Sequence, residues 1–414
     1  MENIAHAFAG LLVARAAVVW RKRRDDAPPG ERFARQAAWV SALANNVPDG
    51  DLVLTPLTGG KLGYLVHHRG HTHTLVIGVV LGLLVAAAAI AIARLRGAPP
   101  PRADARWLLG LGVLGPMIHI GMDGWNVYGV HPFWPFDKRW FYGDAVFILE
   151  PLLWLAAAPF LFRDATSRVF RAFVGLVAIL GLVLPWLVGS FVPLPLRLSL
   201  LLFAGVTVGL ATRVGERARA ALGLGLFFSV PVLFFSLSGA ADRAVRARLA
   251  ALFPTEVVAD VAISSWPANP LCWSAVAVTT TEGGDLVLRR ASFALEPGVL
   301  PVASCPSREG PITAPLAPVD AVGDAALRWE GEHRVSLARL RQLVRERCDV
   351  AALARFFRAP FLAPRPSTFV LGDLRFDRDE ALDFAEVELP HEASPCPRFV
   401  PDWEPPRAAE LDPP

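Results

Sequence analysis

Apolar segments long enough to cross a lipid bilayer are the feature that most constrains how this chain can fold. The clearest is residues 74–95, TLVIGVVLGLLVAAAAIAIARL, because a transmembrane helix needs about 20 apolar residues in a row. Further segments of this kind lie at 107–122, about 145–162, 169–190, 196–212 and 219–238. Residues 4–20 are apolar too, but they are of marginal length for a span. The sequence therefore predicts a polytopic α-helical membrane domain of about six to seven helices.

The composition agrees with a membrane protein and changes towards the C-terminus. Apolar residues make up 53% of the chain and charged residues 19%, whereas soluble domains have about 25% charged residues. The net charge of +3 is too small to indicate a nucleic-acid partner. From about residue 243, runs such as 273–280 indicate strands and 336–358 indicates amphipathic helices. We therefore expect a helical membrane domain over 1–242 and a smaller soluble α+β domain over 243–414, with a Pro-rich tail.

The distribution of arginine predicts the orientation of the helices. Ten arginines lie in three predicted loops, 94–106, 163–171 and 213–219. Positively charged loops face the cytoplasm, which assigns residues 21–73 and everything after 243 to the periplasmic side. The RKRR cluster at 21–24 conflicts with this assignment.

The four cysteines all lie in the last third of the chain, at positions 272, 305, 348 and 396. None forms a CxxC pair, so a cysteine-rich zinc module is not expected. They would form disulfides if this region lies outside the cytoplasm. Free thiols are the alternative.

Histidine and aspartate are concentrated in the membrane half. Seven of the nine histidines lie within the first 131 residues, among segments apolar enough to enter a bilayer. Ionisable groups are costly there and mark functional sites, and a divalent metal binds imidazole and carboxylate groups together. His119 and Asp123 are four residues apart on a predicted helix, which places both side chains on one face. They could bind one cation together or form a hydrogen-bonded pair at the helix end.

Two short polar segments carry further candidates. Asp49 and Asp51 alternate in NNVPDGDL, so in an extended segment both carboxylates would point to one site; ordinary turn residues are the alternative. His71 and His73 alternate in HHRGHTHT, a spacing that suits metal ligands, although His-rich tracts also bind metals adventitiously. Arg69 in the same tract could hold a phosphate or a carboxylate.

The order of these motifs resembles a known family. The segments concerned are His6, PDGD at 48–51, HRGHTH at 68–73, HIGMD at 119–123 and YGVHPFWPF at 128–136. In this order they resemble the YdjM-type bacterial membrane proteins, which are known as membrane-bound metal-dependent hydrolases. The resemblance implies a multi-pass protein of the bacterial inner membrane that binds a divalent metal, zinc or manganese.

The membrane half is also similar in pattern to zinc-dependent phospholipase C, whose ligands include an early His, an Asp, a His and a His-x-x-x-Asp pair. The matching positions are His6, Asp49 or Asp51, His71 or His73, His119 and Asp123. The later ligands of that family, a His and a His-x-x-x-Glu pair, have no clear match. The similarity therefore implies one or two metals rather than a complete three-zinc site.

Together these inferences give the hypothesis of a membrane-bound metal-dependent hydrolase that acts on a phosphoester or a lipid-derived, amphiphilic substrate. The implied metal ligands are His6, Asp51, His71, His73, His119 and Asp123. Asp49 would orient the attacking water or bridge a second metal, and Arg69 would neutralise charge on the substrate. A structural metal in a protein that is not an enzyme and an ion- or proton-coupled transporter are the alternatives. The expected partners are membrane lipids and the substrate, and no nucleic acid.

Overall fold

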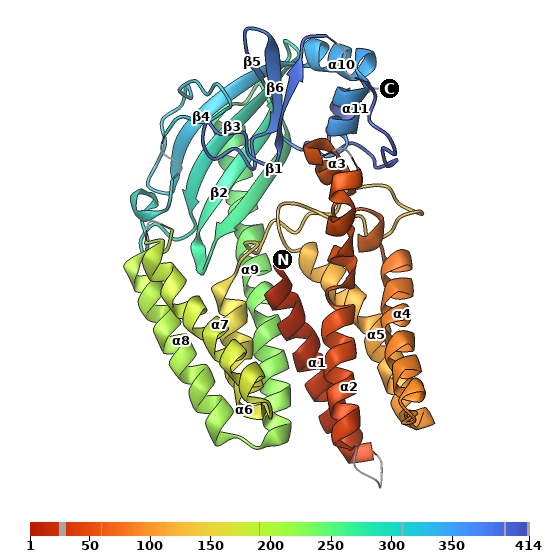
Figure 1. Cartoon of the computed structure of the whole chain (residues 1–414). Coiled ribbons are helices and arrows are strands. Elements are labelled where there is room, and N and C mark those ends of the chain that lie inside the picture. The colour runs from red at the N-terminus through yellow and green to blue at the C-terminus, as the bar shows by residue number, and fades with distance from the viewer. Residues whose placement is uncertain (25–29, 59, 190, 308–309, 393–394, 412–414) are drawn as a thin grey trace.

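The computed structural model describes residues 1–24, 30–58, 60–189, 191–307, 310–392 and 395–411. It shows a bundle of helices and an α+β half that covers one end of the bundle (Figure 1). Among the described residues, six helices are long and apolar enough to cross a membrane: α1 (Asn3–Arg24), α4 (Leu75–Leu95), α5 (Arg102–Asp123), α7 (Arg168–Leu187), α8 (Leu194–Arg213) and α9 (Glu216–Leu252). The shorter elements of the bundle are α2 (Glu31–Ala44), η1 (Val47–Leu57), α3 (Gly60–His67), η2 (His71–His73) and α6 (Pro151–Asp164). The predicted fold class, a helical membrane domain followed by an α+β domain, is confirmed.

Two predicted spans differ from the observed helices. The segment at about 145–162 contains α6, which begins at Pro151 and has 14 residues. Such a helix is about 21 Å long, shorter than the roughly 30 Å of the hydrocarbon core, so it is not a membrane-length helix. It is apolar because most of its side chains are buried in the bundle. The segment 4–20, of marginal length by sequence, belongs to α1, whose 22 residues are enough for a span.

Helices α4 and α5 pack closely because glycines stand where they cross. A Cβ atom at Gly82 of α4 would overlap the carbonyl oxygen of Gly112 in α5. Small residues of this kind let helix backbones approach each other within a membrane. This packing fixes the position of the His/Asp residues, since α5 ends at Asp123 and α4 begins directly after the histidines of η2.

The arginine-rich ends of the helices lie away from the α+β half (Figure 1). Helix α1 runs away from that half and α2 returns towards it, so RKRR at 21–24 lies at the same end as the α4–α5, α6–α7 and α8–α9 connections. The expectation that all of 21–73 lies on the side of the C-terminal half is therefore wrong for its first residues, and the conflict in the arginine distribution disappears. Near this end Arg15 forms ion pairs with Asp164 and Glu216, at 2.8 and 2.6 Å, which join α1 to α6 and α9.

The C-terminal half contains two antiparallel sheets, of order β1-β2-β3-β4 and β5-β6-β7. The strands are β1 (Val257–Trp266), β2 (Asn269–Thr280), β3 (Asp285–Ala294), β4 (Leu327–Ser336), β5 (Pro360–Pro364), β6 (Thr368–Asp373) and β7 (Glu386–Pro390). They are accompanied by η3 (Val302–Ser304), α10 (Leu337–Glu346), α11 (Cys348–Ala354) and α12 (Ala408–Leu411). Helix α9 leads into β1 and continues to Leu252, beyond the expected boundary at residue 242. Leu65 and Tyr128 of the helical half belong to the same hydrophobic core as both sheets, so the two halves pack as one body.

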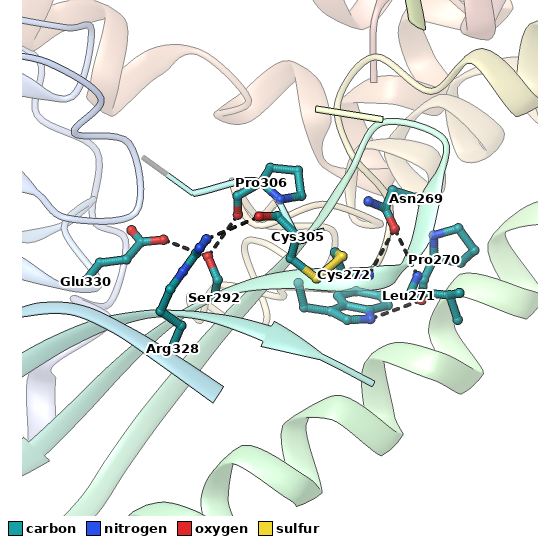
Figure 2. The surroundings of a disulfide bond; sticks show 10 residues. Asn269, Pro270, Leu271, Cys272, Ser292, Cys305, Pro306, Arg328 and Glu330 are labelled. Carbon is teal, nitrogen blue, oxygen red and sulfur yellow. Dashed lines mark hydrogen bonds between the residues drawn. A yellow bond between two sulfur atoms is a disulfide. The ribbon is translucent and has the colours of Figure 1, made fainter. Parts of the chain in front are cut away.

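All four cysteines are joined in disulfides, Cys272–Cys305 and Cys348–Cys396. Figure 2 shows the first of these, which fastens the segment after η3 to β2. The same segment is held by the Ser292 hydroxyl, which donates to the Pro306 carbonyl oxygen at 2.9 Å, and by Arg328, which donates to that of Cys305 at 3.2 Å (Figure 2). Disulfides persist in oxidising compartments, so the pairs favour an extracytoplasmic C-terminal half.

A buried glutamate joins the two halves. The Glu150 carboxylate, directly before α6, accepts hydrogen bonds from the amides of Leu152 and of Ala268 in the β1–β2 turn, at 3.0 and 3.1 Å. Burial raises the pKa of the Glu150 carboxyl to about 8, although both hydrogen bonds favour its charged form. The native state therefore retains a proton that the unfolded chain releases near the usual pKa of 4.5.

We expect this carboxyl to make stability depend on pH. Its contribution is complete below the unfolded pKa of 4.5 and is lost as the pH rises through about 8, because the native state binds the proton more tightly. Glu150→Gln keeps an acceptor oxygen and removes the charge, so at about pH 9 it should stabilise the protein by on the order of 2–5 kcal/mol. Thermal unfolding in detergent at about pH 5 and about pH 9 measures the effect. A difference from wild type that is the same at both pH values would contradict it.

Candidate metal centre

Four of the predicted site residues meet at the end of the bundle that the C-terminal half covers. Asp49 comes from η1, His73 from η2, and His119 and Asp123 from the last turns of α5. One ligand atom of each lies within 4.8 Å of those of the other three. We refer to these four residues as the His/Asp cluster.

The atoms of the His/Asp cluster are close and almost completely buried. His73 Nε2 lies 3.2 Å from Asp49 Oδ1 and 3.2 Å from Asp123 Oδ2. His119 Nε2 lies 3.5 Å from the same two oxygens. The two Nε2 atoms are 3.1 Å apart. Both histidines and Asp123 are buried, whereas the Asp49 side chain is 10% exposed.

The surroundings of His119 determine which ring nitrogen is free to bind a metal. His119 Nδ1 lies 2.6 Å from the main-chain carbonyl oxygen of Asn45, at the end of α2. A carbonyl oxygen only accepts hydrogen bonds, so Nδ1 carries the hydrogen. In the neutral ring Nε2 then presents its lone pair to the His/Asp cluster. Metal-binding histidines are commonly oriented in this way, by a hydrogen bond from the other ring nitrogen to a neighbouring acceptor.

The same reasoning applies to His73. The Thr72 hydroxyl donates to Asp51 Oδ2 at 3.1 Å, so its oxygen is left to accept from His73 Nδ1, which lies at 3.1 Å. Asp51 Oδ2 is 3.6 Å from the same Nδ1. A proton on Nδ1 again directs the Nε2 lone pair towards the His/Asp cluster.

The donor set fits a divalent metal. Two imidazole lone pairs and two carboxylate oxygens converge in a buried place, an arrangement that a bound cation stabilises. Two histidines and two aspartates are ligands that suit zinc, and also manganese or iron. Asp49 also belongs to a second group, with Asp51 and His68, whose ligand atoms lie within 4.8 Å of one another.

Arg69 holds the ligand Asp123 in place. Its guanidinium forms an ion pair with Asp123 Oδ2 at 3.0 Å and donates to the Asn126 side-chain oxygen at 3.0 Å. It also lies over the Tyr128 ring, at 4.6 Å from the centroid. Arg69 has a φ of 57°, a left-handed conformation that is costly for a residue with a side chain and is found at functional sites. The structure thus pairs this guanidinium with Asp123. Its role towards the charge of a substrate stays a prediction.

The remaining predicted ligands lie around the His/Asp cluster. His6 Nε2 is 3.2 Å from Asp123 Oδ1, which also pairs with the Met1 amino group, and the His6 ring stacks on His119 at 3.8 Å. Asp51 lies behind His73, where it accepts from Thr72 and from the Arg69 amide.

His71 is not brought to the His/Asp cluster. Its ring lies against Trp134 and Trp403, with centroids at 4.7 and 4.8 Å, and burial lowers its pKa. His131, in the YGVHPFWPF segment, lies between two tryptophans: its ring is stacked on Trp403 at 4.0 Å and tilted against Trp140 at 3.8 Å. Burial lowers the pKa of His131 to about 3, so its ring is neutral.

Three supporting residues were not singled out by the sequence analysis. His68, whose Nδ1 lies 3.2 Å from Asp51 Oδ1, stands in the HHRGHTH tract, so its position was a usable signal. Thr72 stands in the same tract, but its link between Asp51 and His73 is visible only in three dimensions. Asn45 acts through its main chain, so its side-chain type carries no signal.

The fold and the cluster define an integral membrane protein with several spans and a buried His/Asp group that could hold a metal ion. Residues 1–192 match the family model described as YdjM inner membrane protein. The match confirms the resemblance to that family over a segment that contains the whole His/Asp cluster. The similarity to zinc-dependent phospholipase C stays a prediction. No curated protein and no solved structure matches the chain.

A substitution of Asp51 tests whether the residues behind His73 strengthen metal binding. Asp51→Asn removes the negative charge behind His73, so we expect metal affinity to fall by about 10- to 100-fold while the ligands stay in place. Competition with a metal chelator, read by elemental mass spectrometry, measures the change. Asp137→Asn, in the exposed aromatic loop, is the matched control. Unchanged affinity in Asp51→Asn would show that this carboxylate does not act on His73.

Proposed function

We propose that this chain is a membrane-bound metal-dependent hydrolase, and that the His/Asp cluster is its metal centre. The observation that carries the proposal is the convergence of both Nε2 lone pairs with Asp49 and Asp123 in a buried site, each Nδ1 being held by an outer partner. These four residues would hold a divalent metal, which would supply the Lewis acidity needed to activate water and polarise a scissile ester. Phosphoester hydrolysis is the reaction that we assign, by analogy with the family resemblance.

The residues of the chain take distinct roles in this proposal. His73, His119 and Asp123 would hold the metal, while Arg69 fixes Asp123 and compensates its charge. Asp49 is the one member of the His/Asp cluster that is partly exposed, so its carboxylate can both bind the metal and accept a proton from an attacking water. A catalytic metal keeps one coordination position for water, whereas a structural metal has all of its positions filled by protein ligands. The partial exposure of Asp49 would let water reach that position.

We place the metal centre and the C-terminal half on the periplasmic side of the bacterial inner membrane. The disulfides of the C-terminal half require an oxidising compartment. The arginine-rich ends of the helices lie at the opposite end of the bundle, as cytoplasmic ends do.

The metal content and the activity of the purified protein test the proposal together. We expect about one or two zinc or manganese ions per chain by elemental mass spectrometry, and hydrolysis of phosphodiesters that a chelator abolishes and added metal restores. A protein that binds the metal but hydrolyses no phosphoester or lipid ester would support a structural or transport role instead. A protein that binds no metal after reconstitution would contradict the site itself.

A further inference from the structure

The water-facing side of the His/Asp cluster is covered by the C-terminal half. Arg375 donates to the Val127 carbonyl oxygen at 2.7 Å, beside the residues that hold Arg69. The Tyr128 ring packs on Phe356 and Phe384, with centroids at 5.0 and 6.1 Å. A substrate dissolved in water therefore meets the C-terminal half before it can reach the metal ligands.

The C-terminal tail adds to this cover. The Trp403 indole donates to the Val66 carbonyl oxygen at 3.1 Å, in α3. Its ring contacts His71, the first residue of η2, and His131 in the loop after α5. The C-terminal tail therefore also covers the HHRGHTH tract.

The more open side of the site belongs to η1. Asp49 and Asp51 of η1, with His68, are partly exposed, whereas His73 and His119 are completely buried. A group that approaches the cluster from this side meets the two aspartates of η1 first.

The outer surface of η1 is apolar. Val53 is 79% exposed and Leu57 is 80% exposed. The sequence from 52 to 58, LVLTPLT, carries no charged residue. Exposed apolar side chains that gather in one segment mark a surface that contacts lipid or another apolar partner.

This apolar surface is continuous with the lipid-facing surface of the helices. Segment η1 packs against α4, and Val76, in the first turn of α4, is 46% exposed. Trp39 and Leu43 of α2, which leads into η1, are exposed as well. Because Val76 comes only three residues after His73, the apolar surface of the bundle reaches the level of the metal ligands.

We propose that η1 is an interfacial segment inserted in the periplasmic leaflet, and that it forms the lateral opening through which a membrane amphiphile brings its phosphoester headgroup to the His/Asp cluster. The chains of the amphiphile stay in the bilayer beside Val53 and Leu57, while the headgroup passes Asp51 to reach Asp49. This inference rests on the proposed function, and it narrows the substrate to a lipid or a lipid-linked phosphoester.

The position of η1 can be measured without any activity. All four cysteines are paired in disulfides, so Val53→Cys and Leu57→Cys each supply one thiol for an environment-sensitive dye. In nanodiscs we expect nitroxide-labelled lipids to quench the dye at both positions. Val322→Cys, which is 89% exposed on the C-terminal half, is the control and should respond only to a quencher dissolved in water. Labels at 53 and 57 that behave like the control would overturn the proposal.

The opening itself is tested by comparing two substrates with the same phosphoester headgroup, a long-chain lipid in vesicles and a dispersed short-chain analogue. Val53→Asp should lower turnover of the long-chain substrate by about tenfold or more, because a charge in this segment opposes insertion, and should leave the short-chain analogue and the metal content unchanged. An equal loss on both substrates, or no loss on either, would overturn the lateral opening. If wild type hydrolyses neither substrate, the proposed function fails, and the dye measurement alone decides whether η1 lies in the bilayer.

Discussion

Replacing His119 by alanine is expected to remove the metal and, with it, the hydrolysis. His119 supplies one of only two imidazole nitrogens of the His/Asp cluster, and it is completely buried. Loss of an outer partner alone weakens metal binding by about 10- to 100-fold, so loss of a ligand should lower affinity by more than about 100-fold. The bound metal per chain, measured by elemental mass spectrometry after chromatography in detergent, should fall to background.

Asp123, the second predicted ligand on α5, is better tested by a substitution that keeps the shape of its side chain. Asp123→Ala would leave the Arg69 guanidinium buried without its partner, which costs about 3–5 kcal/mol and could unfold the site. Asp123→Asn keeps the shape and removes the charge, and we expect it to lose the metal while the protein stays inserted. His333→Ala, on β4 of the C-terminal half, should change neither metal content nor activity. Full metal occupancy in both α5 variants would show that the ligand face of α5 is assigned wrongly.

The ligand pair on α5 could be predicted because a helix imposes its own geometry. A spacing of four residues brings His119 and Asp123 to one face wherever the helix lies, and both side chains are in the cluster. Five of the six membrane-length helices of the described residues were predicted as clear spans, while α1 was predicted as marginal and α6 was predicted as a span. The error arose because apolarity alone does not distinguish a lipid-facing helix from one that is apolar because it is buried. Helix α6 belongs to the second kind.

For the candidate ligands outside the helices, the sequence predicted which residues were candidates but not which of them reach the His/Asp cluster. In an extended segment Asp49 and Asp51 would face one way, but η1 is a 3-10 helix, and it sends Asp49 to the cluster and Asp51 behind His73. The turn η2 likewise directs His73 inwards and His71 towards Trp403. These turns are set by contacts with distant parts of the chain, Trp403 among them, which no local spacing encodes.

Loss of the Arg375 guanidinium should lower the stability of the protein strongly. Arg375 and Asp373 lie in the LGDLRFD segment and form a buried ion pair with contacts of 2.9 and 2.7 Å. Removing one member of a buried pair leaves the other charge without a partner, which costs about 3–5 kcal/mol. Arg375 also donates to the Val127 carbonyl oxygen, so the same change releases the C-terminal half from the loop beside the metal centre.

We therefore expect Arg375→Met, which keeps much of the side-chain volume, to lower the unfolding temperature and to make the C-terminal half sensitive to protease in folded, membrane-inserted protein. Arg334→Met is the matched control, because the Arg334 side chain is 53% exposed and Glu332 keeps its ion pair with Arg289. A pair with an exposed arginine contributes about 0–1 kcal/mol. Thermal unfolding and limited proteolysis of both variants measure the difference. If Arg375→Met and Arg334→Met unfold at the same temperature as wild type, neither the ion pair with Asp373 nor the hydrogen bond to Val127 stabilises the protein as proposed. The cover over the metal centre would then depend on the aromatic contacts of Tyr128 and Trp403.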